Sequence, residues 1–368
     1  MPDLILNSTP YNKEDLAKGQ FGNPSTLFEK ATLAFCKDWL SGRKEFQVQT
    51  SGSTGTPKTI TLTRKQLEAS AQMTCEALGL QPGTTSLICL NTEFIAGKMM
   101  IVRSLVTGMK MIAVEPSSNP FASLPADMTI DFTALVPYQV KKILDSPQAN
   151  RLNAVHTILI GGADVEDEIA ERIKSFQCTA YATFGMTETI THIALRPLDK
   201  ENYFTTLPGV SIDTDDRGCL VIEVPYLAAP VATNDLVVLM GINKFRWVGR
   251  WDNVINTGGV KMSPETIERR IRHLLINKKF FVTGIRDNDL GESVALIIEG
   301  NEPKEGDTKS LTEAVRPFLR PYEVPRKIFY LRDFCYTESG KVDRKGTLAL
   351  AHRQVCPASS PGGDDAES

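Results

Sequence analysis

The stretch Thr50-Ser51-Gly52-Ser53-Thr54-Gly55-Thr56-Pro57-Lys58 is the most informative part of this 368-residue chain. It follows a strand-like run, EFQVQT (45–50). Small hydroxyl residues and two glycines let backbone N–H groups and hydroxyls surround an anion, and Lys58 adds a positive charge. The stretch is not a Walker A loop, because that pattern needs Gly-Lys-Ser/Thr and here Pro57 precedes the lysine. A phosphate loop is therefore predicted, with a flexible Ser/Thr/Gly linker as the alternative.

From about residue 46 to 240, short apolar runs rich in β-formers alternate with helical patterns. Strands are predicted at 86–91, 110–116, 132–137 and 156–162, and helices at 64–79, 138–146 and 166–176. This alternation predicts an α/β fold, with a large N-terminal domain of βαβ layers around a mostly parallel sheet. From about residue 205, short strands separated by turns indicate a β-rich subdomain, with strands at 218–225 and 234–240.

The last third of the chain predicts a small, separate α+β domain of roughly 115 residues. Its expected elements are helices at 264–275 and 311–320 and strands at 280–287, 293–300 and 327–334. The tail 357–368 is rich in Pro, Ser and Gly and is acidic, so we expect it to be disordered.

The composition argues against several classes of protein. Hydrophobic residues make up 42% and charged residues 23%, which is typical of a soluble globular protein. No apolar run approaches the roughly 20 residues that span a bilayer, and the N-terminal stretch lacks a signal pattern. We therefore expect a cytoplasmic protein without a membrane span. The net charge of −3, without blocks of Lys and Arg, argues against a nucleic-acid partner.

The cysteines and histidines give no sign of a metal or disulfide framework. The seven cysteines are dispersed and never form a CxxC pair. The four histidines have no metal-ligand spacing, so each is interpreted as a packing or surface residue. Reduced, mostly buried thiols are expected, and the sequence says nothing about oligomeric state.

Five segments, in one order, resemble the motifs of the adenylate-forming superfamily, which contains acyl-CoA synthetases, nonribosomal peptide adenylation domains and luciferases. The first is the phosphate loop. The others are Phe184-Gly185-Met186-Thr187-Glu188, Thr233-Asn234-Asp235, the hinge motif that begins Gly249-Arg250-Trp251-Asp252, and Ser339-Gly340-Lys341-Val342-Asp343-Arg344. Together they span nearly the whole chain.

The resemblance implies a fold and an activity. It implies an N-terminal adenylation domain (1–251) and a mobile C-terminal domain (252–356) that carries a catalytic lysine. The expected substrates and cofactors are a small carboxylic acid, ATP, Mg²⁺ and coenzyme A, and the product is an acyl thioester formed through an acyl-adenylate.

The resemblance also implies roles for the nucleotide-binding residues. Phe184 would lie on the adenine face, Thr187 on a phosphate and Glu188 on Mg²⁺, which takes few protein carboxylates and completes its shell with phosphate and water. The remaining expected nucleotide contacts are Thr50, Ser51, Gly52, Ser53, Thr54, Gly55, Lys58, Gly161, Gly162 and Ala163. Outside the family, Thr187 would be interpreted as a helix cap.

Asp235 has the form of a carboxylate that accepts two ribose hydroxyl hydrogens, with Arg250 beside it. Asn234 stands where the family has glycine. Since Asn tolerates left-handed backbone, we expect the ribose contact to be kept. Asp252 is expected to be the hinge between two domain orientations, one for adenylation and one for thioester formation.

Lys341 is the expected catalytic residue. Attack of a carboxylate on the α-phosphorus concentrates negative charge between two anions. A cation there should stabilise the transition state by about 2.7–4 kcal/mol, by analogy with one oxyanion donor. No general base is needed, because the carboxylate is already ionised at neutral pH.

The acid is indicated by a further resemblance. The phosphate loop begins at Thr50, so the part of the chain before it is short for the superfamily. That feature, with the segment 91–98 and Arg103, resembles the o-succinylbenzoate–CoA ligases of menaquinone biosynthesis. A dicarboxylate substrate needs a second cation, and Lys98 and Arg103 are candidates, although either could be an ordinary exposed helix residue. Another acyl- or aryl-CoA ligase, an enzyme that loads a carrier-protein thiol, and a non-catalytic homologue remain as alternatives.

Overall fold

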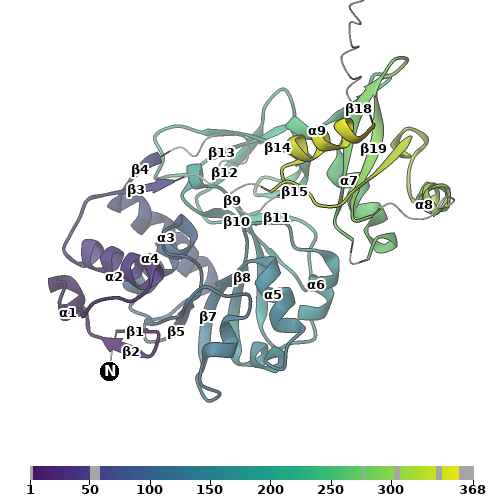
Figure 1. Ribbon diagram of the computed structural model, residues 1–368. Helices are drawn as coiled ribbons and strands as arrows, with labels where there is room; N and C mark the ends of the chain where they lie inside the picture. The colour runs from purple at the N-terminus through teal and green to yellow at the C-terminus, as the bar shows by residue number, and fades with distance from the viewer. Residues whose placement is uncertain (1–2, 50–58, 277, 302–306, 337–341, 356–368) are drawn as a thin grey trace, which may run out of the picture. The chain divides into compact units, whose positions relative to one another are not determined.

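The computed structural model describes residues 3–49, 59–276, 278–301, 307–336 and 342–355. These residues form two compact units (Figure 1). The first comprises the described residues of Met1–Asp215, Leu220–Thr233 and Val238–Arg246, and the second those of Asp216–Cys219, Asn234–Val237 and Trp247–Ser368. The boundary at residue 252 and the disordered tail stay predictions, and the tail lies outside the described residues.

A largely parallel sheet is the centre of the first unit. Six neighbouring strands, in the spatial order β9-β8-β7-β5-β6-β1, run parallel. Their bounds are β1 (Leu4–Leu6), β5 (Thr85–Ile88), β6 (Lys110–Ala113), β7 (Ile130–Leu135), β8 (Val155–Ile160) and β9 (Thr179–Gly185). Antiparallel strands extend this row at both ends. At one end β2 (Thr9–Tyr11) pairs with β1, and at the other β10 (His192–Pro197) pairs with β9 and β11 (Phe204–Thr206) with β10. The predicted mostly parallel sheet is confirmed.

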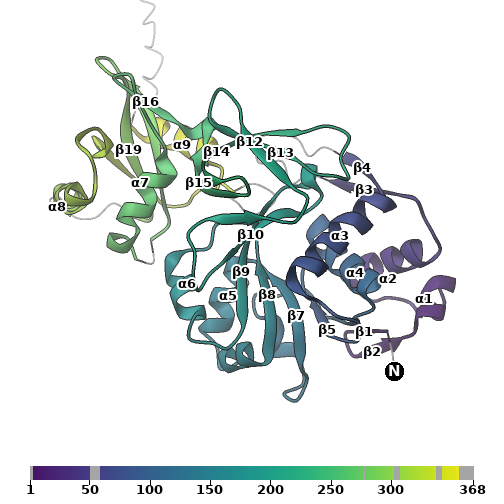
Figure 2. The same cartoon turned by 180° about the vertical axis from the view of Figure 1, so that it is seen from behind.

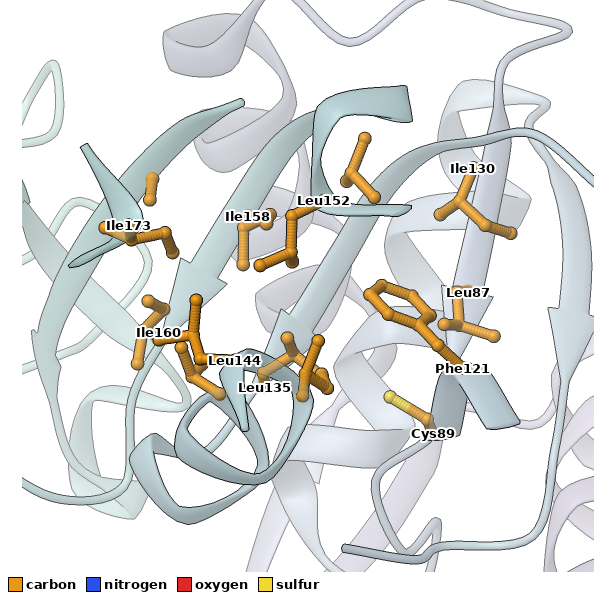
Figure 3. Close-up of a cluster of buried hydrophobic side chains, with 14 of the residues drawn as sticks. Leu87, Cys89, Phe121, Ile130, Leu135, Leu144, Leu152, Ile158, Ile160 and Ile173 are labelled. Atoms are coloured by element: carbon orange, nitrogen blue, oxygen red, sulfur yellow. The ribbon is translucent and has the colours of Figure 1, made fainter. Parts of the chain in front are cut away.

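Helices cover both faces of this sheet. Leu87 of β5 belongs to a buried cluster with side chains of α5 (Pro137–Leu144) and α6 (Asp167–Ile173) (Figure 3). The preceding residue, Ser86, points to the other face, where its Oγ lies 2.6 Å from Ser104 Oγ of α4 (Ile95–Thr107). The helices α1 (Lys13–Lys18), α2 (Leu27–Leu40) and α3 (Arg64–Leu78) complete the unit.

Helix α3 shows why the sequence pattern predicted its bounds. Thr63 caps its N-terminus in a capping box with Gln66, and Gly79 ends it in a left-handed conformation. The helices predicted at 64–79, 138–146 and 166–176 are confirmed as α3, α5 and α6. None of the described helices is long and apolar enough to cross a membrane.

Short antiparallel strands make up the β-rich part of the chain. The hairpin of β3 (Glu45–Gln49) and β4 (Thr59–Thr63) flanks the predicted phosphate loop. From residue 204 onward, β12 (Ser211–Thr214) pairs with β13 (Cys219–Glu223), and β15 (Lys244–Arg250) pairs with β11; β14 (Val231–Gly241) lies between them in the sequence. The predicted β-rich character of this region is confirmed.

The second unit is α+β, as predicted (Figure 2). Its sheet has the order β17-β16-β19-β18, with β20 beside β19. The elements are β16 (Ile255–Thr257), β17 (Val260–Met262), α7 (Pro264–Ile271), β18 (Phe280–Asp287), β19 (Gly291–Glu299), α8 (Asp307–Val315), β20 (Lys327–Leu331) and α9 (Arg344–Val355). The helix predicted at 311–320 was placed too far along the chain, since α8 ends at Val315. The reason is Pro317, which cannot donate a helical hydrogen bond.

Candidate active site

Two of the predicted site segments lie outside the described residues. They are the phosphate loop, with Thr50, Ser51, Gly52, Ser53, Thr54, Gly55 and Lys58, and the catalytic Lys341. The other predicted residues fall into a group on the first unit and a group on the second, and each group is described by itself.

The ends of β8 and β9 carry the predicted adenine side of the first group. A Cβ at Gly161 would lie 2.3 Å from Thr183 Oγ1 on β9, so the strands approach closely only because the residue is glycine. Gly162 has φ +85°, which also favours glycine. Gly162 and Ala163 are exposed beyond the strand end. Residues 161–163 add no bulky side chain of their own at this strand end, which leaves room for a flat ring.

Phe184 lies at the end of β9 in a cluster of three aromatic rings. Its ring centroid is 5.0 Å from that of Phe245, edge to face, and 5.7 Å from that of Phe204. The side chain is half-buried. Phe184 is thus fixed by packing on one side while part of the ring stays accessible.

Thr187 and Glu188 lie on the short 3₁₀ turn Thr187–Thr189 that follows β9. Thr189 closes this turn, because its Oγ1 accepts from Met186 N (3.1 Å) and donates within the same turn. Glu188 is exposed, and it forms no ion pair with any described residue. Its carboxylate is therefore available to a cation.

Directly after this turn, the chain makes a strained reversal at Ile190. Its φ of 69° and ψ of −58°, with a hydrogen bond from Thr191 N to Thr189 O (2.8 Å), define a γ-turn of the rare type. A β-branched residue at positive φ is unusual and costs on the order of 1–3 kcal/mol. The buried Ile190 side chain holds the turn in place. This reversal separates Glu188 from Thr191 and His192.

The second group is centred on Asp235, which is 7% exposed. Trp247 Nε1 donates to Asp235 Oδ1 (3.0 Å), and Arg250 Nη1 lies 3.6 Å from Oδ2. Burial raises the pKa of the Asp235 carboxyl, while the bond from Trp247 and the charge of Arg250 oppose the rise. The structure thus brings Asp235 and Arg250 together, as the sequence predicted, and adds Trp247.

Asn234 and Asp252 belong to the same network. Asn234 Nδ2 donates to both carboxylate oxygens of Asp252 (3.2 and 3.1 Å), and Arg250 Nη2 donates to Oδ2 (3.3 Å). Asn234 lies in the extended strand β14 and is not among the residues with positive φ. The argument from left-handed backbone was therefore wrong. The Asn234 amide instead ties the predicted ribose strand to the predicted hinge residue.

The two predicted acid-binding cations, Lys98 and Arg103, lie on α4 but point in different directions. Five residues at 100° each place them about 140° apart around the helix. Lys98 is half-buried, and its Nζ donates to Glu93 O (2.6 Å) in the preceding loop. Burial lowers the pKa of Lys98. The two cations therefore do not form one site.

Arg103 is 2% exposed and has no acidic partner among the residues that the structure describes. Its Nη2 donates to Thr191 Oγ1 (3.0 Å), and its Nη1 lies 3.9 Å from Met100 Sδ. The Nε atom has no hydrogen-bond partner in the described part of the chain, and no described carboxylate forms an ion pair with the guanidinium. Burial lowers the pKa of Arg103 to about 10. A buried cation with an unused donor is suited to an anion supplied from outside the protein.

Several residues of these groups carry no recognisable sequence signal. Trp247 gave no pattern of its own, although it stands two residues before the hinge motif. Thr191 and His192 lie three and four residues after Glu188, but each histidine was interpreted as a packing or surface residue. The partner of His192 Nε2, Thr74, is 118 positions away, so no local pattern could reveal that contact.

Comparison with protein families places residues 48–216 in the AMP-binding enzyme family. A crystal structure of an acyl-CoA synthetase (AMP-forming)/AMP-acid ligase II-like protein from Dyadobacter fermentans is 39% identical, with a TM-score of 0.60. The match covers 90% of this chain and 97% of that one. An O-succinylbenzoate coenzyme A synthetase from Bacillus subtilis, solved with ATP and magnesium, is 20% identical with a TM-score of 0.72, over 82% of this chain and 69% of that one. At that identity the likeness shows the fold alone.

Curated relatives add names at lower identity. The 2-succinylbenzoate–CoA ligase of Salmonella typhimurium is 26% identical over 83% of this chain and 68% of its own length. A salicylyl-CoA synthase/salicylate adenylyltransferase of Streptomyces is also 26% identical, over 80% of this chain and 60% of its own length. The chain thus spans about two thirds of the length of these relatives.

Proposed function

We propose, from the premise that this chain belongs to the AMP-binding, adenylate-forming family of acyl-CoA synthetases, that it joins a carboxylic acid to a thiol at the expense of ATP. In the first step, a carboxylate oxygen attacks the α-phosphorus of ATP and releases pyrophosphate. In the second, the thiol attacks the acyl carbon of the adenylate and releases AMP. Coenzyme A is the proposed thiol and the cytoplasm the proposed compartment.

The described residues fit a nucleotide and a magnesium ion. The glycines at 161 and 162 leave space beyond the sheet edge, and the exposed Glu188 carboxylate has no ion-pair partner among the described residues. Asp235 offers a fixed carboxylate oriented by Trp247. Mg²⁺, when bound, would neutralise phosphate charge, with Glu188 as its protein ligand and Thr187 on a phosphate oxygen.

The protein's own tasks in the first step are to orient and to stabilise. The acid needs no general base, since it is ionised at neutral pH. We assign charge stabilisation to Lys341 on the basis of its motif, and ribose binding to Asp235 with Arg250. For the second step we propose that the C-terminal domain (252–356) turns about Asp252, whose carboxylate is held by side chains of Asn234 and Arg250.

For the acid we propose o-succinylbenzoate, a dicarboxylate. One observation supports this choice most: Arg103 is a buried arginine with an unused Nε and no carboxylate partner among the described residues. The second carboxylate of a diacid would satisfy it, whereas a monoacid would leave the charge buried and unpaired. Several relatives are named 2-succinylbenzoate–CoA ligases, which agrees with the proposal.

The experiment is pyrophosphate release from ATP over a panel of acids, followed by the mass of the product with and without coenzyme A. We expect o-succinylbenzoate to give the highest kcat/KM and a thioester only when coenzyme A is present. If the enzyme prefers salicylate, the acid named for the Streptomyces relative, the proposed substrate would be an aryl monoacid instead of a diacid. If pyrophosphate release depends on the acid but an acyl product forms only with a carrier-protein thiol, that thiol would replace coenzyme A as the acceptor.

A further inference from the structure

A chain of buried and partly buried hydrogen bonds connects Arg103 to helix α3. Arg103 Nη2 bonds to Thr191 Oγ1 (3.0 Å), Thr191 Oγ1 lies 3.4 Å from His192 Nδ1, and His192 Nε2 lies 3.0 Å from Thr74 Oγ1. Thr74 Oγ1 then donates to the carbonyl of Ser70 one helical turn earlier (3.2 Å). All of these residues belong to the first unit, and Thr74 and His192 are buried.

The two end groups of this series of hydrogen bonds, the Ser70 carbonyl and the Arg103 guanidinium, determine which atom carries each proton. The Ser70 carbonyl can only accept, so it takes the single hydroxyl proton of Thr74. Thr74 then offers only lone pairs to His192, and Nε2 must carry a hydrogen. At the other end, Arg103 can only donate, so Thr191 Oγ1 accepts from it and directs its own proton toward Nδ1. The only neutral imidazole that fits is the tautomer with hydrogen on Nε2.

A protonated imidazole does not fit the same chain. Nδ1–H and Arg103 would then both donate to Thr191, and its own proton would have no acceptor within the chain. Burial, and secondly the charge of Arg103, lower the pKa of His192 well below 6.5, in agreement with a neutral ring. The other titratable groups close to Arg103 are Cys75 and Tyr226, and burial raises the pKa of both. Arg103 is thus the one charge of this cluster among the described residues.

The backbone fixes the same arrangement from the opposite side. The γ-turn at Ile190 sets the direction in which the chain enters Thr191, and Tyr226 Oη donates to the carbonyl of Thr189 (3.2 Å). The acceptor for Arg103 is therefore held by the strained turn and by the imidazole together.

We propose that His192 is a positioning residue for acid selection: its neutral Nε2–H form, anchored on Thr74, holds Thr191 as an acceptor and so aims the unpaired Arg103 guanidinium at the second carboxylate of the substrate. This role rests on the proposed function, in which Arg103 binds that carboxylate. It assigns specificity to a hydroxyl on α3 that does not itself touch the Arg103 guanidinium.

The kinetic test compares isosteric variants that lose or keep a hydroxyl. The readout is a ratio of two kcat/KM values. The numerator is the value for o-succinylbenzoate, and the denominator is the value for the one of its two monoamides that the wild type activates. Thr191→Val and Thr74→Val should each lower this ratio by about fivefold or more, the equivalent of about one hydrogen bond. Thr191→Ser and Thr74→Ser should keep it within about twofold of wild type. Thr157→Val is the matched control. It also removes a threonine–histidine hydrogen bond, to His156 (2.9 Å), but that bond does not belong to the series that connects Arg103 to α3.

Histidine ¹⁵N NMR supplies a second readout that needs no substrate. His192 should show the Nε2–H tautomer, unchanged between pH 5.5 and 8, and Thr74→Val should shift its ring signals while Thr157→Val leaves them in place. Equal selectivity ratios for the valine and serine variants, or an Nδ1–H or protonated ring, would overturn the role. A wild-type ratio near one would instead remove the proposed diacid function, and the role with it, whatever the tautomer.

Discussion

Replacing Arg103 by methionine should stabilise the protein while it removes the preference for a diacid. Methionine has a similar reach and keeps the packing between α4 and its neighbours. The substitution removes a charge that has one strong hydrogen bond, to Thr191 at 3.0 Å, and no acidic partner among the described residues. Stability and activity should therefore move in opposite directions.

The expected gain in the free energy of unfolding follows from the pKa of the guanidinium. Burial lowers this pKa from its ordinary value to about 10, which corresponds to a cost of about 3 kcal/mol for the charged form in the folded state. Because the folded pKa of this base is lowered, the cost is fully present at all pH values below about 10, including pH 7. Losing the bond to Thr191 costs about 1 kcal/mol. The net gain of about 2 kcal/mol should raise the Tm by about 4–8 °C.

The assay is thermal unfolding at pH 7 together with steady-state kinetics. We expect kcat/KM for o-succinylbenzoate to fall by about 10- to 100-fold, since a hydrogen bond to a charged group contributes about 1.5–3 kcal/mol. Arg151→Met is the control, because Arg151 donates to the carbonyls of Phe121, Leu124, Pro125 and Met128 and its loss should destabilise. A drop in the Tm of Arg103→Met, or unchanged selectivity, would refute the reasoning.

Four further predictions concern other parts of the chain. Lys341→Ala should abolish adenylate formation, leave ATP binding within a few-fold, and still convert pre-formed adenylate into thioester; adenylate formation at the wild-type rate would remove the assignment. Asp252→Pro should slow thioester formation from isolated adenylate far more than Asp252→Ala does, because only proline fixes φ, and equal rates for the two variants would exclude the hinge. Trp247→Phe removes the donor to Asp235 Oδ1 and should raise KM for ATP about tenfold. The acidic limb of the pH profile of this KM should move to higher pH. An unchanged KM would exclude Asp235 from nucleotide binding. Hydrogen bonds from Asn7 and Ser25 lower the pKa of Glu29 from 4.5 to about 2. Glu29→Gln should therefore lower the free energy of unfolding by about 1 kcal/mol at pH 7, and this difference should vanish as the pH falls through about 2. A loss of stability that does not depend on pH would contradict this.

Local patterns predicted the elements whose ends are set by local chemistry. Helix α3 begins at a capping box and ends at a glycine, and β18 (Phe280–Asp287) was placed at its observed bounds. Helix α8 was misplaced because apolar spacing was followed across Pro317. The motifs identified Asp235 and Arg250, which the structure brings together, and separately Glu188, whose carboxylate is exposed.

The rest of the site depends on contacts that a linear pattern does not contain. Arg103 lies on α4, Thr74 on α3 and Thr191 directly before β10, and only the fold shows that Arg103 is buried with no described carboxylate beside it. From sequence, Lys98 and Arg103 were equivalent candidates. Burial and helix position separate them, because Lys98 reaches a loop carbonyl while Arg103 faces the cluster of His192.

The central claim is that the acid is activated by attack of its own carboxylate on the α-phosphorus. It is tested most directly with o-succinylbenzoate carrying ¹⁸O in both carboxylates, incubated with ATP, Mg²⁺ and coenzyme A, and mass spectrometry of the nucleotide product. The proposed function predicts AMP that carries one ¹⁸O atom for each thioester formed, because the bridging oxygen of the adenylate leaves with AMP. Formation of ADP with ¹⁸O in inorganic phosphate, or thioester with unlabelled AMP, would contradict it.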